Sequence, residues 1–424
     1  MPRAAILTFD ERVDRRILRE AESLSAAGYA VVGLAGPRHG ADSDPDPPWL
    51  ERLPGTASAS GVRGSVAYEL WIRFGRPLAA RFPAVRRIGT AGRTGLMQAG
   101  MFDPTGYSDA LLYPTAAKIV ADVYIAHDLP LLPTAVKCAR ARGAAAVYDS
   151  HELWAEQFES PAREKWAAME QAWIGGADAV IAVNASIAGE LQRRYGLDEV
   201  AVVHNSEHPI PRTPERPRRF HETFGLPPEV RVVLFQGVYF SDRNLDALVR
   251  AFALVRDPRI HLVMLGWGEA AGALVALVRR LGLAGRVHFH PKVPQDDLLH
   301  YTQSAHVGVI PYQPVSLNSR YCSPNKLFEF IAAGLPIIAT DLPELRRFVA
   351  GLDVGLVGDT ATPESFAGLI EGYFADPALA ARFERNMPAA QARACWAVDS
   401  VAFMSAVERA LAQRAAGELS GSVR

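Results

Sequence analysis

The chain has 424 residues, which is long for a single hydrophobic core and favours two or three domains. Apolar residues make up 49% of it and charged residues 21%, a composition typical of globular proteins that argues against disorder. The formal net charge is −1, so no overall positive field points to nucleic acid, and we expect no nucleic-acid partner.

The cysteines and the apolar runs indicate the compartment. Cys138, Cys322 and Cys395 stand at wide, unrelated spacings that fit neither a disulfide framework nor a zinc site. The N-terminus is too poor in apolar residues for a signal peptide, and no apolar run approaches the ~20 residues of a spanning helix. We therefore expect a cytoplasmic protein, in solution or on the inner face of the membrane.

Short apolar runs alternate with amphipathic stretches along the chain, which indicates parallel sheets covered by helices on both faces. In the first half, strands are predicted at residues 4–9, 30–34, 123–126, 145–148, 179–183 and 200–203, and a helix at 15–27. In the second half, strands are predicted at 230–235, 261–265, 287–290, 307–310 and 336–339, and helices at 245–255 and 325–333. A proline-rich passage separates the two sets, so we place a linker near residues 207–228. The last stretch, 398–415, is amphipathic and precedes no strand.

One segment, residues 55–118, does not follow the alternation. Between residues 63 and 93 it carries aromatic side chains among many arginines. Such a stretch can lie on an anionic membrane surface. It can equally be a solvated insertion with a few core aromatics.

Polar residues follow four predicted strands of the first half. They are His127, Asp128, Asp149, Ser150, His151, Glu152, Asn184, His204 and Asn205. Each alone could be an ordinary loop or helix-capping residue. Ligands of open parallel sheets bind outside the carboxyl ends of the strands, so four such ends together favour a cleft.

Two cations stand near predicted helix starts in the second half. Arg243 follows Gly237 in what reads as a first helical turn, and Lys326 follows a predicted N-cap at Ser323 and a proline. The helix dipole disfavours cations there, unless an anion such as a diphosphate lies between them. Glu329 shares the helix face of Lys326. It either forms an ion pair with Lys326 or accepts hydrogen bonds from a ribose diol, and both interpretations stay open.

At these residues the chain resembles the retaining glycosyltransferases of family 4, which have the GT-B fold. The segment 323–339 is similar to the family's donor-binding helix and the strand after it, and Glu329 matches the second glutamate of its E-x7-E motif. The segment from Gly237 to Arg243 resembles the diphosphate-binding segment, and Lys292-Val293 resembles the loop that meets the base. The resemblance implies donor-binding positions at Gly237, Arg243, Lys292, Val293, Tyr321, Ser323, Asn325, Lys326, Leu327 and Glu329.

Three positions depart from the family pattern. Tyr321 stands where the first glutamate of E-x7-E is usual, and Val238 stands where an arginine often follows the glycine. Glu11-Arg12 replaces a glycine pair near the first helix. These changes leave the expected fold and phosphate site intact but bear on the transferred sugar and on turnover.

The resemblance implies an α/β chain of two facing, Rossmann-like, doubly wound domains. Residues 1–206 would bind the acceptor, 207–395 would bind the nucleotide-sugar donor, and 396–424 would form a helix that crosses back to the first domain. The expected reaction is retaining transfer from a donor such as a UDP- or GDP-sugar to a glycan, a lipid-linked or a small-molecule acceptor. His127, His151 and Glu152 are the catalytic candidates, and Asp128, Asp149 and Asn205 are expected in the acceptor cleft.

We expect no cofactor and no metal, because no acid or histidine cluster shows ligand spacing along the chain. Three other functions remain. A sugar-nucleotide epimerase would consume the donor without an acceptor, and a silent homologue would support a partner transferase. A Rossmann dehydrogenase is disfavoured because no strand is followed by G-x-G-x-x-G.

Overall fold

The computed structural model describes residues 1–38, 45–54, 105–213 and 215–421. The chain forms two compact units, one of Met1–Val203 with Ser400–Arg424 and one of His204–Asp399. The division lies a few residues from the bounds expected at 206 and 396. The basic stretch between residues 63 and 93 lies wholly outside the described residues, and its membrane role stays a prediction.

The first unit contains a parallel seven-stranded sheet in the order β3-β2-β1-β4-β5-β6-β7. Its strands are β1 (Arg3–Thr8), β2 (Ala30–Ala35), β3 (Leu50–Arg52), β4 (Val123–His127), β5 (Ala145–Ser150), β6 (Ala179–Ala182) and β7 (Ala201–Val202). Six of these confirm the strands predicted for the first half. The edge strand β3, which has only three residues, was not predicted.

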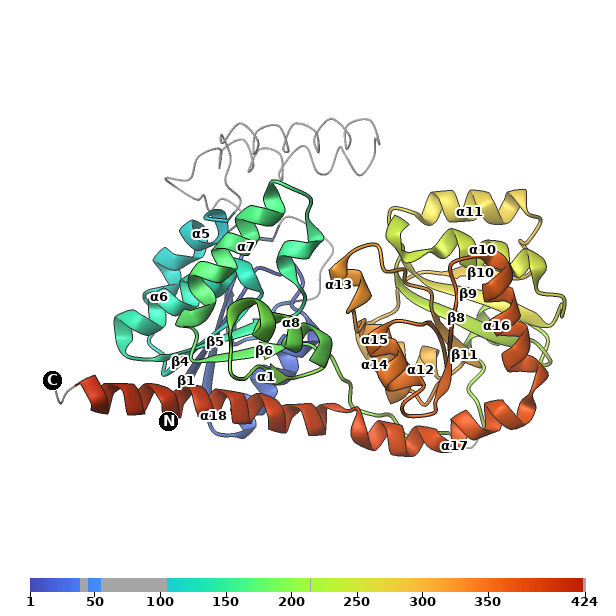
Figure 1. The fold of residues 1–424 in the computed structure, drawn as a ribbon. Helices are drawn as coiled ribbons and strands as arrows, with labels where there is room; N and C mark the ends of the chain where they lie inside the picture. Colours follow the sequence, from blue (N-terminus) through green and yellow to red (C-terminus); the bar gives the residue numbers. More distant parts are fainter. Residues whose placement is uncertain (39–44, 55–104, 214, 422–424) are drawn as a thin grey trace. The chain divides into compact units, whose positions relative to one another are not determined.

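Helices cover both faces of this sheet. They include α1 (Arg15–Ala26), α5 (Tyr107–Ala116), α6 (Leu132–Arg142), α7 (Ala162–Trp173), α8 (Ala185–Tyr195) and most of α18 (Trp396–Gly421). In Figure 1, α5, α6 and α7 lie on one side of the sheet, and α1 and α18 lie on the other. Asp14 caps α1 by accepting a hydrogen bond from the backbone N–H of Arg16 at 2.8 Å.

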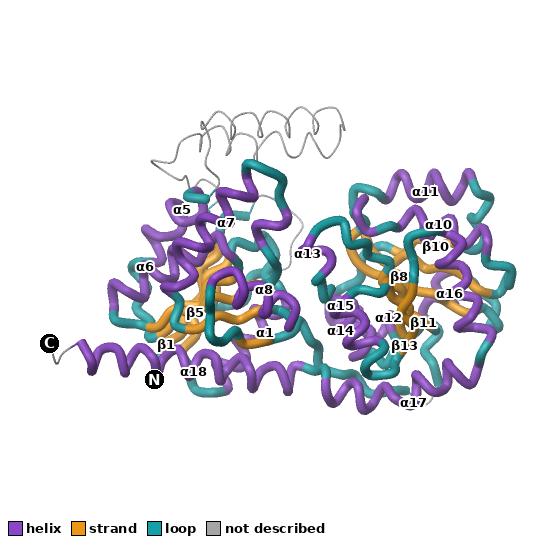
Figure 2. Tube along the Cα trace, viewed as in Figure 1, coloured by secondary structure: helices purple, strands orange, loops and turns teal. Residues whose placement is uncertain are grey.

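The second unit contains a parallel six-stranded sheet in the order β10-β9-β8-β11-β12-β13. Its strands are β8 (Arg231–Val238), β9 (Ile260–Trp267), β10 (Val287–His290), β11 (Val307–Ile310), β12 (Ile337–Thr340) and β13 (Gly355–Gly358). The first five confirm the predicted strands, and the short edge strand β13 was missed. Figure 2 shows the strands of each unit gathered in one layer between helices.

The helices of the second unit again lie on both faces. They are α9 (Arg219–Phe224), α10 (Leu245–Leu254), α11 (Ala271–Arg280), α12 (Gln295–Thr302), α13 (Leu317–Arg320), α14 (Asn325–Ala332), α15 (Pro343–Val349), α16 (Pro363–Ala375) and α17 (Pro377–Arg393). In Figure 1, α10, α11 and α16 lie on one side of the sheet, and α12 and α14 lie on the other.

Two predicted helix starts are wrong in detail. Arg243 ends a short 3-10 turn, Ser241–Arg243, and α10 begins two residues later after Asn244, whose positive φ of 56° separates the two. The residue that precedes α14 is Pro324, and no side chain caps this helix, so Ser323 is not its N-cap. Lys326 nevertheless lies in the first turn, as predicted.

Both sheets reverse their strand order beside their first strand, between β1 and β4 and between β8 and β11. Such a reversal sends the following helices to opposite faces and opens a crevice at the carboxyl ends of the two strands. Each unit therefore has a defined place for a ligand. No helix of the described residues is long and apolar enough to cross a membrane.

Candidate functional site

At the crevice of the first unit, three predicted residues meet in a buried group that we call the histidine cluster: His127, Asp149 and His151. Nδ1 of His127 lies 3.1 Å from Nε2 of His151. These atoms lie 3.4 and 3.3 Å, respectively, from the same Asp149 oxygen. His127 is 3% exposed, whereas the His151 side chain is 14% exposed. His151 is therefore the histidine that can reach a ligand, and His127 supports it.

A buried arginine from α1 fixes Asp149. Arg16 donates from Nε and Nη2 to the two oxygens of Asp149, at 2.9 and 2.5 Å. It also bonds Glu20 at 2.9 Å and the carbonyl of Val203. Glu20 in turn lies 3.4 Å from Nε2 of His127, although the two atoms are poorly aligned for a hydrogen bond. Asp149 is consequently a positioning residue and cannot contact an acceptor.

Burial and charge separate the protonation states of the cluster. Burial lowers the pKa of His127, which keeps this ring neutral. Burial also opposes the charge of His151, but Asp128 and Asp149 overcome it and raise its pKa to about 10. Burial raises the pKa of Asp128 to about 7. At neutral pH the cluster thus holds a neutral histidine beside a cationic one.

The histidine cluster also has the ligand types of a metal site, since its three ligand atoms lie within 4.8 Å of one another. Spacing along the chain did not reveal this, because β4 and β5 bring the residues together. However, the Asp149 oxygen nearest both histidines already accepts a hydrogen bond from Arg16 at 2.9 Å. A metal ion there would meet that guanidinium charge at close range, so the residues fit a proton-bearing cluster better.

The other acceptor candidates differ in their position relative to this cluster, and Asp128 borders it with a carboxylate oxygen 4.0 Å from Nδ1 of His151. Asp128 has a positive φ of 66° and accepts a hydrogen bond from the backbone of His151 at 3.2 Å. Glu152 is half-buried, and its backbone carbonyl accepts from Ser150 at 2.9 Å. Asn205 belongs to the second unit, where it donates to the Asn325 side chain at 2.8 Å. Its expected place in the acceptor cleft stays a prediction.

At the crevice of the second unit, two predicted cations flank one tyrosine. The guanidinium carbon of Arg243 lies 4.2 Å from the ring centre of Tyr312, and the Lys326 ammonium lies 4.5 Å from it. Lys326 also donates to the Tyr312 hydroxyl and lies 5.2 Å from the ring centre of Phe235. We call Arg243, Lys326 and Tyr312 the cation site.

No carboxylate of the described residues forms an ion pair with Lys326, although this residue is only 6% exposed. Its charge is met by aromatic rings and one hydroxyl. Within the described part of the chain, Arg243 forms one ion pair, in which its Nε lies 3.6 Å from an Asp242 oxygen. A buried cation normally requires an opposite charge, and a bound anion would supply one.

Glu329 lies one turn after Lys326 on α14 and is buried. It accepts a hydrogen bond from the side-chain amide of Gln236, whose oxygen accepts from Thr302 at 2.7 Å. This chain fixes the carboxylate beside the end of β8. Gly237, next along β8, has a φ of 121°, and a Cβ there would lie 3.3 Å from the Lys326 ammonium. Glycine keeps the space beside this cation open.

The remaining donor candidates lie outside the cation site. Lys292 follows β10 and lies 5.9 Å from the ring of Trp267, and Val293 packs on the core. Tyr321 is the residue directly after the short helix α13, and Ser323 is buried. Leu327 is fully buried, so its side chain cannot touch a donor.

Comparison with known protein families matches each unit to a glycosyltransferase model. Residues 13–206 match the model described as Glycosyltransferase Family 4, and residues 218–389 match the model described as Glycosyl transferases group 1. Together these matches span most of both units. The chain belongs to the family 4 glycosyltransferases.

Curated relatives of this glycosyltransferase carry one recurrent name. The D-inositol 3-phosphate glycosyltransferase of Streptomyces avermitilis is 30% identical over 254 residues, covering 55% of this chain and 52% of the relative. That of Xylanimonas cellulosilytica is 26% identical over 306 residues and covers 68% of each. The chain thus spans about half to two thirds of the length of these relatives.

Solved structures show the same fold. A sucrose-phosphate synthase from Thermosynechococcus elongatus matches with a TM-score of 0.71 at 18% identity, covering 97% of this chain and 100% of that one. Anabaena Alr3699/HepE in complex with UDP matches with a TM-score of 0.66 at 13% identity, covering 96% and 100%. The glycosyltransferase has the GT-B fold expected from its sequence.

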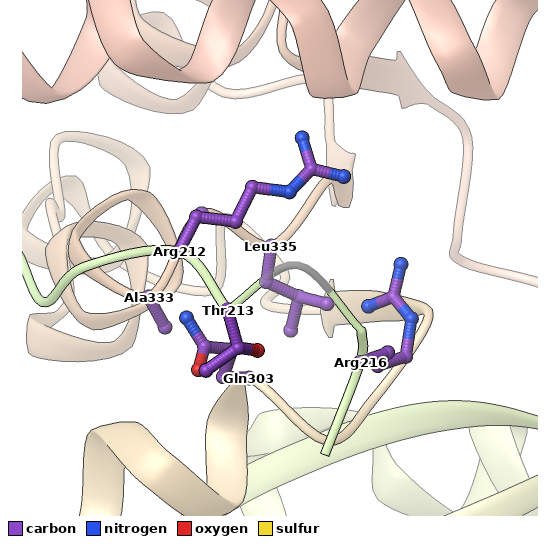
Figure 3. Close-up of a pocket in the computed structure, with 7 residues that line it drawn as sticks. Arg212, Thr213, Arg216, Gln303, Ala333 and Leu335 are labelled. Carbon is purple, nitrogen blue, oxygen red and sulfur yellow. The ribbon is translucent and has the colours of Figure 1, made fainter.

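One pocket of the second unit is separate from the cation site. It is lined by Arg212, Thr213, Arg216, Gln303, Ala333, Gly334 and Leu335. Figure 3 shows Leu335 between the two arginines. Both arginines pair with Glu384, at 2.5 and 2.7 Å, and the pocket lies at the C-terminal end of α14, where the helix dipole disfavours anions. It is not a second phosphate site.

Proposed function

We propose that this glycosyltransferase moves a sugar from a nucleoside diphosphate sugar, bound at the cation site, to a hydroxyl group of an acceptor bound beside the histidine cluster. The observation that carries the proposal is the buried Lys326 ammonium, whose neighbours in the described residues are aromatic rings and a hydroxyl. A diphosphate supplies the missing negative charge. The N–H groups at the start of α14 add donors for its oxygens.

The donor's other parts follow from the same geometry. The Glu329 carboxylate, held by Gln236, accepts from a ribose diol. Lys292 and Val293 lie at the carboxyl end of β10 and would meet the base. The description of HepE in complex with UDP supports a uridine nucleotide as the first ligand to test.

The proposed transfer retains the configuration at the anomeric carbon. The bond from this carbon to the diphosphate oxygen breaks, the bond to the acceptor oxygen forms on the same face, and the diphosphate takes the acceptor's proton. Arg243, Lys326 and the start of α14 stabilise the charge that develops on the leaving group. No side-chain base is required, so His151 orients the acceptor and His127 holds His151.

We further propose that transfer needs no metal ion, because two cations and a helix N-terminus serve the diphosphate. The acceptor is a glycan, a lipid-linked or a small polyhydroxyl molecule, and the relatives' name supports a polyol as a first candidate. Docking on the inner face of a membrane through residues 63–93 would present a lipid-linked acceptor. Co-sedimentation with anionic vesicles at low salt tests this docking. If the protein does not sediment with the vesicles, the docking is excluded.

The donor assignment is tested by titration calorimetry with UDP, GDP and ADP. Arg243→Ala, Lys326→Ala and Glu329→Ala should each weaken binding of the preferred nucleotide by about 1.5–3 kcal/mol, because each removes a charge-assisted contact. Arg250→Ala removes an exposed cation from α10 and serves as the matched control. Wild-type affinity in all three site variants would refute the assignment.

The reaction itself is tested with sugar conjugates of the nucleotide that binds most tightly. NMR then compares the anomeric configuration of the product with that of the donor. Retained anomeric configuration and unchanged rates with a chelator are expected. Donor consumption without an acceptor would indicate an epimerase instead. Tight nucleotide binding with no turnover of any donor would indicate a silent homologue, as Tyr321 allows.

A further inference from the structure

Tyr312 is buried at the centre of the cation site, yet the family resemblance does not single it out. It is 5% exposed and follows β11 by two residues, at the carboxyl end of the strand where the sheet reverses its order. Its ring belongs to the hydrophobic core of the second unit. A phenylalanine would fill that core equally well, so the hydroxyl group needs its own explanation.

The ring of Tyr312 contacts both cations. Arg243 and Lys326 lie 4.2 and 4.5 Å from its centre, distances at which a cation is attracted to an aromatic face. The two cations come from segments 83 residues apart, before α10 and in α14, and like charges repel. A shared aromatic ring holds them near each other without neutralising either one, whereas a carboxylate would cancel the charge that a phosphate requires.

The hydroxyl group of Tyr312 can still donate a hydrogen bond. Its oxygen accepts a hydrogen bond from the Lys326 ammonium. A lysine ammonium can only donate, so the phenolic proton is not used in that contact. In the part of the chain that the structure describes, this proton has no acceptor. A buried O–H group beside two cations is a donor matched to an anionic oxygen.

We propose that Tyr312 positions Arg243 and Lys326 through its ring and donates its phenolic hydrogen bond to the diphosphate of the donor. This inference rests on the proposed donor site and adds a third phosphate-binding side chain to it. The hydrogen bond strengthens as charge develops on the leaving diphosphate, so Tyr312 contributes to turnover as well as to binding.

Two substitutions separate the hydroxyl from the ring. Tyr312→Phe removes only the hydroxyl and should weaken nucleoside diphosphate binding about 10-fold, as expected for one hydrogen bond to a charged group. It should weaken nucleoside monophosphate binding less, since the lost contact is to the diphosphate. Tyr312→Leu also removes the ring and should weaken diphosphate binding further, because the cations lose their common support.

The matched control is Tyr373→Phe in the same unit. Tyr373 is buried on α16, and its hydroxyl donates to the backbone carbonyl of His306 at 3.0 Å, at the opposite end of β11 from Tyr312, so the substitution should leave nucleotide binding unchanged. Thermal unfolding without nucleotide verifies that each variant folds. The ratio of diphosphate to monophosphate affinity is the deciding measurement, because a Tyr312 that merely filled the core would not change it.

The outcomes distinguish this inference from the donor assignment. If Arg243→Ala and Lys326→Ala weaken binding while Tyr312→Phe binds as tightly as Tyr373→Phe, the role of Tyr312 is refuted and the donor site stands. If Tyr312→Phe lowers both affinities equally, the hydroxyl does not meet the diphosphate. If neither cation variant weakens binding, the donor site itself is elsewhere.

Discussion

Arg16 illustrates how a residue outside the crevice can determine its chemistry. Its guanidinium is fully buried and bonds Asp149 and Glu20 together with the carbonyl of Val203. This arrangement joins α1 to the ends of β5 and the chain after β7. Burying a charge is costly, and its removal leaves the opposite charge of Asp149 unpaired.

Arg16→Leu should therefore destabilise the first unit by about 3–5 kcal/mol. Arg163→Leu changes an exposed arginine on α7 in the same way and should shift stability by at most about 0.5 kcal/mol. Urea unfolding, followed by hydrogen exchange in α1 and β5, measures the difference. If both variants unfold at the same urea concentration, the Arg16 network does not hold the cluster.

The strand ends that form the histidine cluster could be predicted from the sequence, but the buried residues that hold them in place could not. His127, Asp149 and His151 were candidates because parallel strands end at one edge, and the structure places them within hydrogen-bonding distance or slightly beyond it. Arg16 precedes Asp149 by 133 residues, and nothing in a helical stretch distinguishes a buried arginine from an exposed one. Tyr312 was hidden for the same reason, since an aromatic residue after a strand usually belongs to the core.

At the scale of elements, the interior strands were predictable because they are continuous apolar runs. The edge strands β3 and β13 are short and partly exposed, so they lack this pattern. The strands β8 and β9 continue beyond their predicted ends through a pair of glycines. A Cβ on Gly266 would lie 2.0 Å from the carbonyl oxygen of Gly237, so the glycine allows the two strands to pair to the edge of the crevice.

His306 supports the adjacency of β8 and β11. It lies just before β11, its backbone N–H donates to the Val232 carbonyl at 2.8 Å, and its Nδ1 accepts from the Val232 N–H at 3.0 Å. Nδ1 can accept only while it carries no proton. Burial, assisted by the charge of Arg216, lowers the pKa of His306 to about 3.

The second unit should consequently lose stability in acid. The ordinary pKa of histidine is 6.5, so His306 is protonated below this pH in the unfolded chain. In the folded chain it becomes protonated only near pH 3. The resulting loss is about 1.4 kcal/mol per pH unit, beginning below pH 6.5. His306→Asn keeps an acceptor oxygen and cannot titrate, so from pH 7 to 5 it should lose up to about 2 kcal/mol less than wild type. Urea unfolding at pH 7 and at pH 5 measures this difference. If both proteins lose the same free energy of unfolding between the two pH values, His306 does not have this role.

At the scale of the whole molecule, the chain enters the second unit once and leaves it once. The chain returns to the first unit within α18. The first residues of this helix, Trp396–Asp399, belong to the second unit, and the remainder belongs to the first. Alternation of strands and helices could predict both sheets, and the proline-rich passage could predict a linker. The exact division could not be read from the sequence, because the proline-rich passage itself is bound to the second unit, for example through Arg212 and Glu384.

The face of α18 that the first unit buries is identified by its spacing. Phe403, Ala406, Val407 and Ala410 recur at helical intervals and are all 0% exposed. Because these residues belong to the first unit, the C-terminal helix should stabilise the unit that contains the N-terminus and leave the nucleotide-binding unit unaffected. A protein of two units need not unfold in one step, so the effect has to be localised.

Phe403→Ala should destabilise the first unit by about 3–5 kcal/mol, because it removes a buried aromatic ring and leaves a cavity. Val401→Ala, on the same helix at 66% exposure, should have little effect. Hydrogen exchange followed by mass spectrometry measures both units in one experiment. In the Phe403→Ala variant, protection from exchange should fall in β1, β2 and α1. Saturating nucleotide should raise protection in β8 and α14 by the same amount in the variant and in the wild type. If Phe403→Ala instead loosens β8 and α14 and leaves β1 protected, α18 belongs energetically to the second unit.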